Sequence, residues 1–224
     1  MKDFLIHNLA KLQNKSPQFC SLVKNVELDK QYIVSTSKSG KPTLSKKFID
    51  GACRTLHSKY DPVNEAVQFT KSYNSAKHSN FIVCGLGLGY HLQELVRIST
   101  KNTKIIVIEK NPAIVKLAFI HNDFSNVIKH PGVVFYVGVN PKNIEEILFD
   151  DRTNLALHGY TLVNFKPLIN IEPDYYKSLE KEIFKTYQKF QIDINTQAAF
   201  SKKFYKNIFD NGQCIINSPG IKTL

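Results

Sequence analysis

The middle of the chain alternates continuous apolar runs with segments of helical periodicity. Four runs predict strands: 81–84, 104–109, 132–137 and a stretch around 160–164. Three segments between them predict helices: 91–97, 112–118 and 141–149. Strands that are apolar throughout are buried on both faces, and strands joined by helices pair in parallel. The pattern therefore predicts an α/β fold with a mostly parallel, Rossmann-like sheet.

The N-terminal segment has a different pattern. Residues 3–14 are amphipathic and predict a short helix. An extended run over 31–37, a turn at Ser39–Pro42 and a second extended stretch predict a β-hairpin. A strong helix start follows, because Asp61 can cap free N–H groups ahead of a proline at the first helical position. Residues 1–60 are thus expected to form a helix-plus-hairpin cap.

The C-terminal part has helical periodicity from Pro173 onward. Apolar residues recur at steps of three and four on both sides of Asn195-Thr196, which predicts a pair of helices with an apolar stripe. The stripe consists of Tyr176, Leu179, Ile183, Tyr187 and Phe190, then Phe200, Phe204 and Ile208. We expect it to pack against the sheet or a neighbouring domain rather than to stack on bases. The expected organisation is a cap over 1–60, a Rossmann-like core over 61–170 and C-terminal helices over 171–224.

Length and composition are those of an ordinary globular protein. The 224 residues are 42% hydrophobic and 22% charged, and no apolar run approaches the roughly 20 residues that a bilayer helix needs. The first residues are too polar for a secretory signal. The four cysteines, Cys20, Cys53, Cys84 and Cys214, have no paired or metal-binding spacing. We therefore expect reduced thiols in a cytoplasmic protein, with no metal site and no membrane segment.

The net charge of +11 raises the question of a nucleic-acid partner. A basic surface increases the affinity for any polyanion. The lysines, however, are dispersed singly and in pairs such as Lys46-Lys47, and no nucleic-acid-binding signature accompanies them. We interpret the charge as a solvated basic surface and do not expect nucleic acid as a partner.

The segment with the clearest chemistry is a glycine-rich turn after the first core strand. Gly85, Gly87 and Gly89 let the backbone turn sharply, so that a ligand can lie against main-chain N–H groups at a helix start. Glu109 ends the next strand, where a carboxylate can accept hydrogen bonds from ribose hydroxyls. The spacing is G-x-G-x-G followed by Tyr90, which resembles the first motif of S-adenosylmethionine-dependent methyltransferases. These five residues are the expected cofactor-binding residues, and S-adenosylmethionine or a nucleotide sugar is the candidate ligand.

Several features argue against the interpretation as an active methyltransferase. Val83 stands where that family usually has an acidic residue, and Asn164-Phe-Lys-Pro167 is only distantly similar to the box of amino-methylating members. Little chain follows Asn164 to form the antiparallel seventh strand of a methyltransferase sheet. The turn is therefore either a ligand site or a tight turn in an inherited scaffold, and both alternatives stay open.

No other group of residues indicates catalysis. His57, His91 and His121 have no carboxylate or cysteine at metal-ligand spacing, so we interpret them as surface or core histidines. Cys84 is interpreted as buried filler, because no general base accompanies it. Asp150-Asp151 is interpreted as a solvated pair in a loop. We assign no catalytic residue.

Three segments together resemble a known family, the N-terminal domain of the motility accessory factor (Maf) family of bacterial flagellin glycosyltransferases. They are Leu56–Ala66, with the element Ser-Lys-Tyr-Asp-Pro, Val83–Leu92, with Gly-Leu-Gly-Leu-Gly-Tyr-His, and Val107–Pro112. The C-terminal segments Phe204–Asn211 and Ser218–Leu224 are similar to that family's approach to its next domain.

The resemblance implies a role in flagellin glycosylation and motility. In that family the following domain, which is 6-hydroxymethylpterin diphosphokinase-like, carries a Gly-Ala-Gly-Pro-Ser-Leu motif and the sugar-nucleotide chemistry. This sequence ends at Leu224, before any such motif. The resemblance therefore implies a module that is not catalytic alone and that acts by partner recognition or domain docking, with flagellin or another protein as partner. The alternative is a methyltransferase or a nucleotide-sugar-binding domain that uses the turn at Gly85–Gly89.

Overall fold

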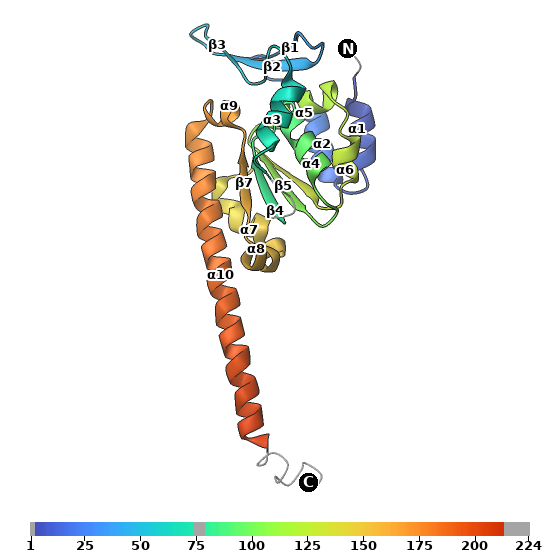
Figure 1. The fold of residues 1–224 in the computed structure, drawn as a ribbon. Coiled ribbons are helices and arrows are strands. Elements are labelled where there is room, and N and C mark those ends of the chain that lie inside the picture. The colour runs from blue at the N-terminus through green and yellow to red at the C-terminus, as the bar shows by residue number, and fades with distance from the viewer. Residues whose placement is uncertain (1–2, 74–78, 213–224) are drawn as a thin grey trace.

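The computed structural model describes residues 3–73 and 79–212 (Figure 1). Cys214 and the segment Ser218–Leu224 lie outside the described residues.

The core of the fold is a four-stranded sheet in which every neighbouring pair is parallel. Its strands are β4 (Asn80–Cys84), β5 (Lys104–Glu109), β6 (Val133–Val137) and β7 (Thr161–Asn164), in the order β6-β5-β4-β7. This confirms the predicted α/β fold with a mostly parallel sheet. Successive strands first add on one side of β4, and then β7 pairs on its other side. The order therefore reverses between β4 and β7, which is the point where open α/β sheets commonly bind ligands.

Helices cover both faces of this sheet because its strands are apolar throughout (Figure 1). One face carries α4 (Tyr90–Ile98), α5 (Pro112–His121), α6 (Ser125–Lys129), α1 (Leu5–Leu12) and α2 (Pro17–Asn25). The other face carries α7 (Ile144–Leu148), α8 (Arg152–His158) and the first part of α10 (Pro173–Asp210). Two short 3₁₀ segments, η1 (Pro141–Asn143) and η2 (Phe149–Asp151), adjoin α7, and α3 (Pro62–Thr70) packs beside α4.

A second, smaller sheet covers the end of the core at which β4 and β5 terminate (Figure 1). Its strands β1 (Tyr32–Thr36), β2 (Pro42–Lys47) and β3 (Cys53–Thr55) are antiparallel in the order β1-β2-β3. The predicted hairpin is thus confirmed, and β3 extends it by a strand that was not expected. The helix α1 lies apart from this sheet, against α5 and α6.

The C-terminal helical region is a single helix, α10, of 38 residues. The predicted division at Asn195-Thr196 is wrong, because asparagine and threonine are only a few tenths of a kcal/mol less favourable than good helix formers. The first half of α10 packs on the domain through Tyr176, Leu179, Ile183, Thr186 and Phe190. The second half projects away from it (Figure 1). Each helix within residues 3–73 and 79–212 is either too short or too polar to span a lipid bilayer.

Candidate functional site

The glycine turn connects β4 to α4 at the point where the strand order reverses. Gly85, Gly87 and Gly89 have φ angles of +87°, +53° and +80°, a region that L residues rarely adopt. The Gly85 N–H donates to the Ile108 carbonyl (2.9 Å) and the Gly89 N–H to the Leu86 carbonyl (2.8 Å). The turn thus has the place and the backbone conformation that the glycine spacing predicts.

Glu109 lies directly beside this turn, with its side chain buried. One carboxylate oxygen, Oε2, accepts from the Leu86 N–H at 2.7 Å, and the other accepts from the Asn111 N–H at 2.9 Å. Burial raises the pKa of Glu109 to about 7, against the opposing effect of these hydrogen bonds. The carboxyl group is therefore used to hold the backbone of the turn and of the following helix start.

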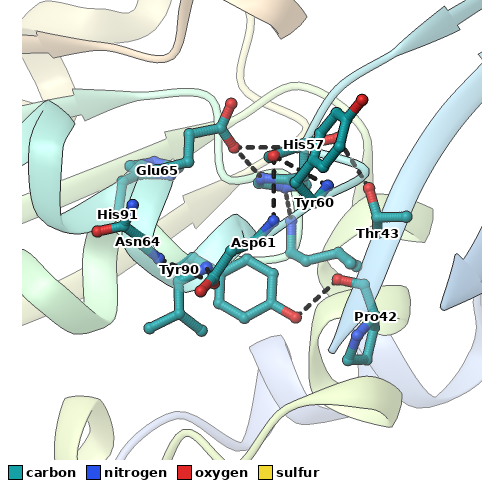
Figure 2. A network of polar contacts seen from close by, with 12 residues as sticks. Pro42, Thr43, His57, Tyr60, Asp61, Asn64, Glu65, Tyr90 and His91 are labelled. Atoms are coloured by element: carbon teal, nitrogen blue, oxygen red, sulfur yellow. Dashed lines mark hydrogen bonds and ion pairs between the residues drawn. The ribbon is translucent and has the colours of Figure 1, made fainter. Parts of the chain in front are cut away.

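The imidazole of His57 accepts a hydrogen bond from a second N–H group of the turn. Its Nε2 accepts from the Leu88 N–H at 2.8 Å, so the ring proton is on Nδ1, which lies 3.8 Å from Glu65 Oε2 (Figure 2). The side chain is only 2% exposed, and burial lowers its pKa. His57 is thus a core histidine, as one of the two interpretations expected, but its pairing with Glu65 was not predicted.

The short element between β3 and α3 positions His57. The Ser58 N–H donates to Glu65 Oε2 at 2.9 Å, and Ser58 Oγ accepts from the N–H groups of Tyr60 and Asp61. Asp61 Oδ1 accepts from two N–H groups at the start of α3, both at 3.0 Å, so the predicted cap is confirmed (Figure 2). Burial alone would raise the pKa of Glu65, but the facing ring N–H of His57 and the hydrogen bond from the Ser58 N–H outweigh it and lower the pKa. The Ser-Lys-Tyr-Asp-Pro element therefore serves to hold an imidazole against the glycine turn.

A second imidazole, that of His91, supports the turn from α4. Its Nε2 donates to the Gly85 carbonyl at 3.0 Å, and its ring stacks on Phe165 at 4.7 Å. Phe165 also stacks on His57, at 4.9 Å. Burial lowers the pKa of His91 to about 3. Both imidazoles are therefore neutral near pH 7 and form one aromatic cluster with Phe165.

Side chains fill the space next to the glycines. A Cβ on Gly87 would lie 2.5 Å from His57 Nε2 and 2.9 Å from Phe165. A Cβ on Gly85 would lie 3.1 Å from Leu168, in α9 (Lys166–Ile169), and one on Gly89 would lie 2.4 Å from Phe124. The tight contacts come from the cap, from α9 and from the α5–α6 connection. In this arrangement no ligand-sized space remains over Gly87.

Two cavities adjoin this region without reaching the turn. One, of about 120 Å³, is lined by His57, Glu65, His91 and Phe165, among others. A groove of about 680 Å³ runs outside α4, past Tyr90 and Arg97. Neither is lined by Gly85, Gly87, Gly89 or Glu109.

The remaining candidates have structural contacts. The Tyr90 hydroxyl donates to the Pro42 carbonyl at 2.8 Å, which ties the small sheet to α4, and burial raises its pKa to about 12. Cys84 is fully buried, and burial raises the pKa of its thiol. Asp151 lies 2.9 Å from Lys104 Nζ, in η2 rather than in a loop. His121 is half-buried at the end of α5. In the described part of the chain, no group of three His, Cys, Asp or Glu side chains is placed to hold a metal ion.

Comparison with known proteins bears on the motif resemblance. Residues 5–152 match the model of the glycosyltransferase Maf N-terminal domain. The chain belongs to this family. The Maf N-terminal match includes the small sheet, the glycine turn and Glu109, and it supports the general context of flagellin glycosylation. No match to the following domain of Maf proteins is found within the 224 residues. No curated protein matches the chain.

Sequence reasoning did not identify the side chains that fill the turn. They are His57, Phe165, Leu168 and Phe124. For His57 a signal was present, because Glu65 follows it within the element that carries the Maf resemblance. Phe165 and Leu168 follow β7, and only the strand order brings the end of β7 beside β4.

Proposed function

We propose that this chain is a non-catalytic Maf-type N-terminal module that takes part in bacterial flagellin glycosylation and motility through partner recognition or domain docking. The observation that carries the proposal is the filled glycine turn. A nucleotide or S-adenosylmethionine held at such a turn bonds to main-chain N–H groups. Here the N–H groups of Leu86 and Leu88 already bond to Glu109 and His57.

The sheet also supports this role over that of a methyltransferase. Within the described ranges, the four-stranded sheet has parallel pairs only, and no antiparallel strand joins it. The carboxyl group beside the turn, Glu109, is 1% exposed and bonded on both oxygens. Both of its oxygens are therefore already engaged by backbone N–H groups of the chain itself. The module is proposed to work in the cytoplasm, with flagellin or another protein as its partner.

The alternative is that Gly85, Gly87, Gly89, Tyr90 and Glu109 bind S-adenosylmethionine or a nucleotide sugar. Such a ligand would have to displace the imidazole of His57 and the ring of Phe165, which are buried with the hydrogen bonds described above. Displacement of His57 would also take away its edge-on contact with the Tyr90 ring, whose hydroxyl bonds to the Pro42 carbonyl.

Calorimetric titration distinguishes the two functions. We expect no heat of binding when S-adenosylhomocysteine or uridine diphosphate is added to the wild-type domain, and no rise in Tm, which a ligand of the native state would produce. Saturable binding that is lost in Glu109→Ala, with Lys203→Ala as a matched surface control, would overturn the non-catalytic proposal. The partner is tested by biolayer interferometry with immobilised domain and flagellin, where we expect saturable binding that Glu109→Gln leaves unchanged.

A further inference from the structure

A crevice lies at the carboxyl ends of β4 and β7, where the strand order of the core sheet reverses. Phe165, the residue after β7, donates its N–H to the carbonyl of Cys84, the last residue of β4, at 3.0 Å. Beyond this bond the two chain segments separate, one into the glycine turn and α4 and the other into α9. Open α/β sheets commonly bind their ligands in such a crevice. Because the space over the glycines is filled, the rest of the crevice decides what can bind.

The crevice contains the cavity of about 120 Å³ described above, which we call the crevice cavity. Three parts of the fold form its mostly apolar wall: α3 with Pro62, Ala66 and Phe69, α4 with Tyr90, and the segment after β7 with Phe165. Glu65 and Lys166 also line it, and both are exposed, so the cavity opens to solvent on their side.

His91 belongs to the wall of the crevice cavity and has an unused hydrogen-bond acceptor. Its Nε2 carries the ring proton, because this nitrogen donates to the Gly85 carbonyl. The neutral ring therefore has a lone pair on Nδ1. Within the described part of the chain, this Nδ1 atom is buried and has no hydrogen-bond partner. A buried acceptor without a partner is costly, and a ligand that donates a hydrogen bond from the cavity removes that cost.

The second imidazole of the cavity, that of His57, supplies a donor. Its Nε2 accepts from the Leu88 N–H, so the proton is on Nδ1. This Nδ1 lies 3.8 Å from Glu65 Oε2, which is longer than a hydrogen bond, and the same oxygen already accepts from the Ser58 N–H. The cavity thus has one imidazole that needs a donor and one whose N–H can still meet an acceptor. A hydroxyl group offers both a donor and an acceptor.

The wall favours an aromatic ring next to that hydroxyl. Phe69, Tyr90 and Phe165 line the cavity, and aromatic rings pair well in edge-on and offset arrangements. An engineered apolar cavity of about 150 Å³ binds benzene, so one six-membered ring fills a slightly smaller cavity that is open on one side. Water suits this cavity less, because each ordered water needs about two to four polar partners.

We infer that the crevice cavity binds a phenol, an aromatic ring that carries one hydroxyl group. The ring packs among Phe69, Tyr90 and Phe165, and the hydroxyl donates to His91 Nδ1. This group comes either from a free phenolic compound or from the tyrosine side chain of a partner protein. The inference is independent of the proposed function, since the residues that line the cavity include neither the three glycines of the turn nor Glu109.

Titration of the wild-type protein with phenol, followed by NMR, tests the site. We expect saturable binding with a Kd on the order of 1 mM or below. The ¹⁵N resonance of His91 Nδ1 should shift upfield on binding, while that of Nε2 stays. Fluorobenzene has the ring without the donor and should bind roughly 3- to 10-fold more weakly. Equal affinity for the two compounds would overturn the inference, as would an unchanged His91 Nδ1 resonance at saturation.

Two variants of α3 test whether phenol occupies the crevice cavity. Ala66 is 5% exposed and lines it, so the larger side chain of Ala66→Leu should weaken phenol binding by about tenfold or more through a direct clash. Gln68→Leu makes a similar change at an exposed position of the same helix and should leave the affinity unchanged. Unchanged binding in a folded Ala66→Leu would refute the location. If that variant does not fold, the His91 resonances of the wild type still decide.

N-acetyltyrosinamide distinguishes the two sources of the phenol group. If it shifts the same His91 resonance at millimolar concentration, the site takes a tyrosine side chain of a partner. If phenol binds and N-acetyltyrosinamide does not, the site takes a free phenolic compound. Binding of neither compound would contradict the inference. The titrations with S-adenosylhomocysteine and uridine diphosphate use other ligands, so the proposed function and this inference can fail separately.

Discussion

Replacing Gly87 by alanine measures how fully the turn is filled. Gly87 has φ +53°, and a Cβ there would lie 2.5 Å from His57 Nε2 and 2.9 Å from Phe165. An L residue in the left-handed region costs about 1–2 kcal/mol. Over-packing of a tight core costs about 1–3 kcal/mol more. We therefore expect Gly87→Ala to lower the free energy of unfolding by about 2–5 kcal/mol.

Gly138→Ala is the matched control for this measurement. Gly138 has a similar φ of +69°, but nothing lies within 4 Å of the position of its Cβ, so only the backbone cost of about 1–2 kcal/mol is expected. Urea denaturation followed by circular dichroism gives both values, and each kcal/mol shifts Tm by about 2–4 °C in a domain of this size. Equal losses in the two variants would show that the space above Gly87 is open. His57→Ala should relieve part of the cost of Gly87→Ala, which a double-mutant cycle detects.

Three further predictions concern groups around the turn and the core. Because the pKa of Glu109 is raised to about 7 in the folded state, its contribution is present at low pH and is lost as pH rises through 7. The contribution of Glu109 to the free energy of unfolding should fall by about 2–3 kcal/mol between pH 5 and pH 8. The buried imidazoles of His57 and His91, whose pKa values are lowered, act in the opposite direction over this range, so the fall is measured as the change with pH in the difference between wild type and Glu109→Gln in denaturation curves. Asp61→Ala removes the cap of α3 and should cost about 1 kcal/mol in the same assay, whereas Asp61→Asn should cost less. Asn8 is 0% exposed and bonds to three backbone groups, so Asn8→Leu should cost about 3 kcal/mol or more, with Asn14→Leu as the exposed control; a loss below 1 kcal/mol would contradict this account.

Local patterns were sufficient to predict most of the core. β5 has the predicted bounds, Lys104–Glu109, because a continuous apolar run of that length forms a buried strand with few alternatives. The start of α3 was predicted because Asp61 and the following proline act on their immediate neighbours. The hairpin was predicted from the turn residues between β1 and β2.

The contents of the site depend on contacts that local patterns do not encode. The spacing of the glycines predicts a sharp turn, and that is confirmed, but the same spacing fits an open site and a filled one. His57 and Phe165 reach the turn only through the fold of the cap and the return of β7 beside β4. β3 has three residues, too few for a periodic pattern. Asn8 was not singled out, because a polar residue in an amphipathic helix is usually on the solvent side.

The hydrogen bond from Leu88 to His57 also has a consequence for the motions of the domain. It joins residues 31 apart in the chain, and the neighbouring bond from Leu86 to Glu109 joins residues 23 apart. We do not expect the Leu88 amide to exchange with solvent through local fraying of the turn, since its acceptor, His57, would have to leave together with its support in the cap and α3. The Leu88 amide should therefore open only when a large part of the domain opens with it. We therefore expect the glycine turn to belong to the slowest-opening part of the fold, which hydrogen exchange of the Leu88 amide measures.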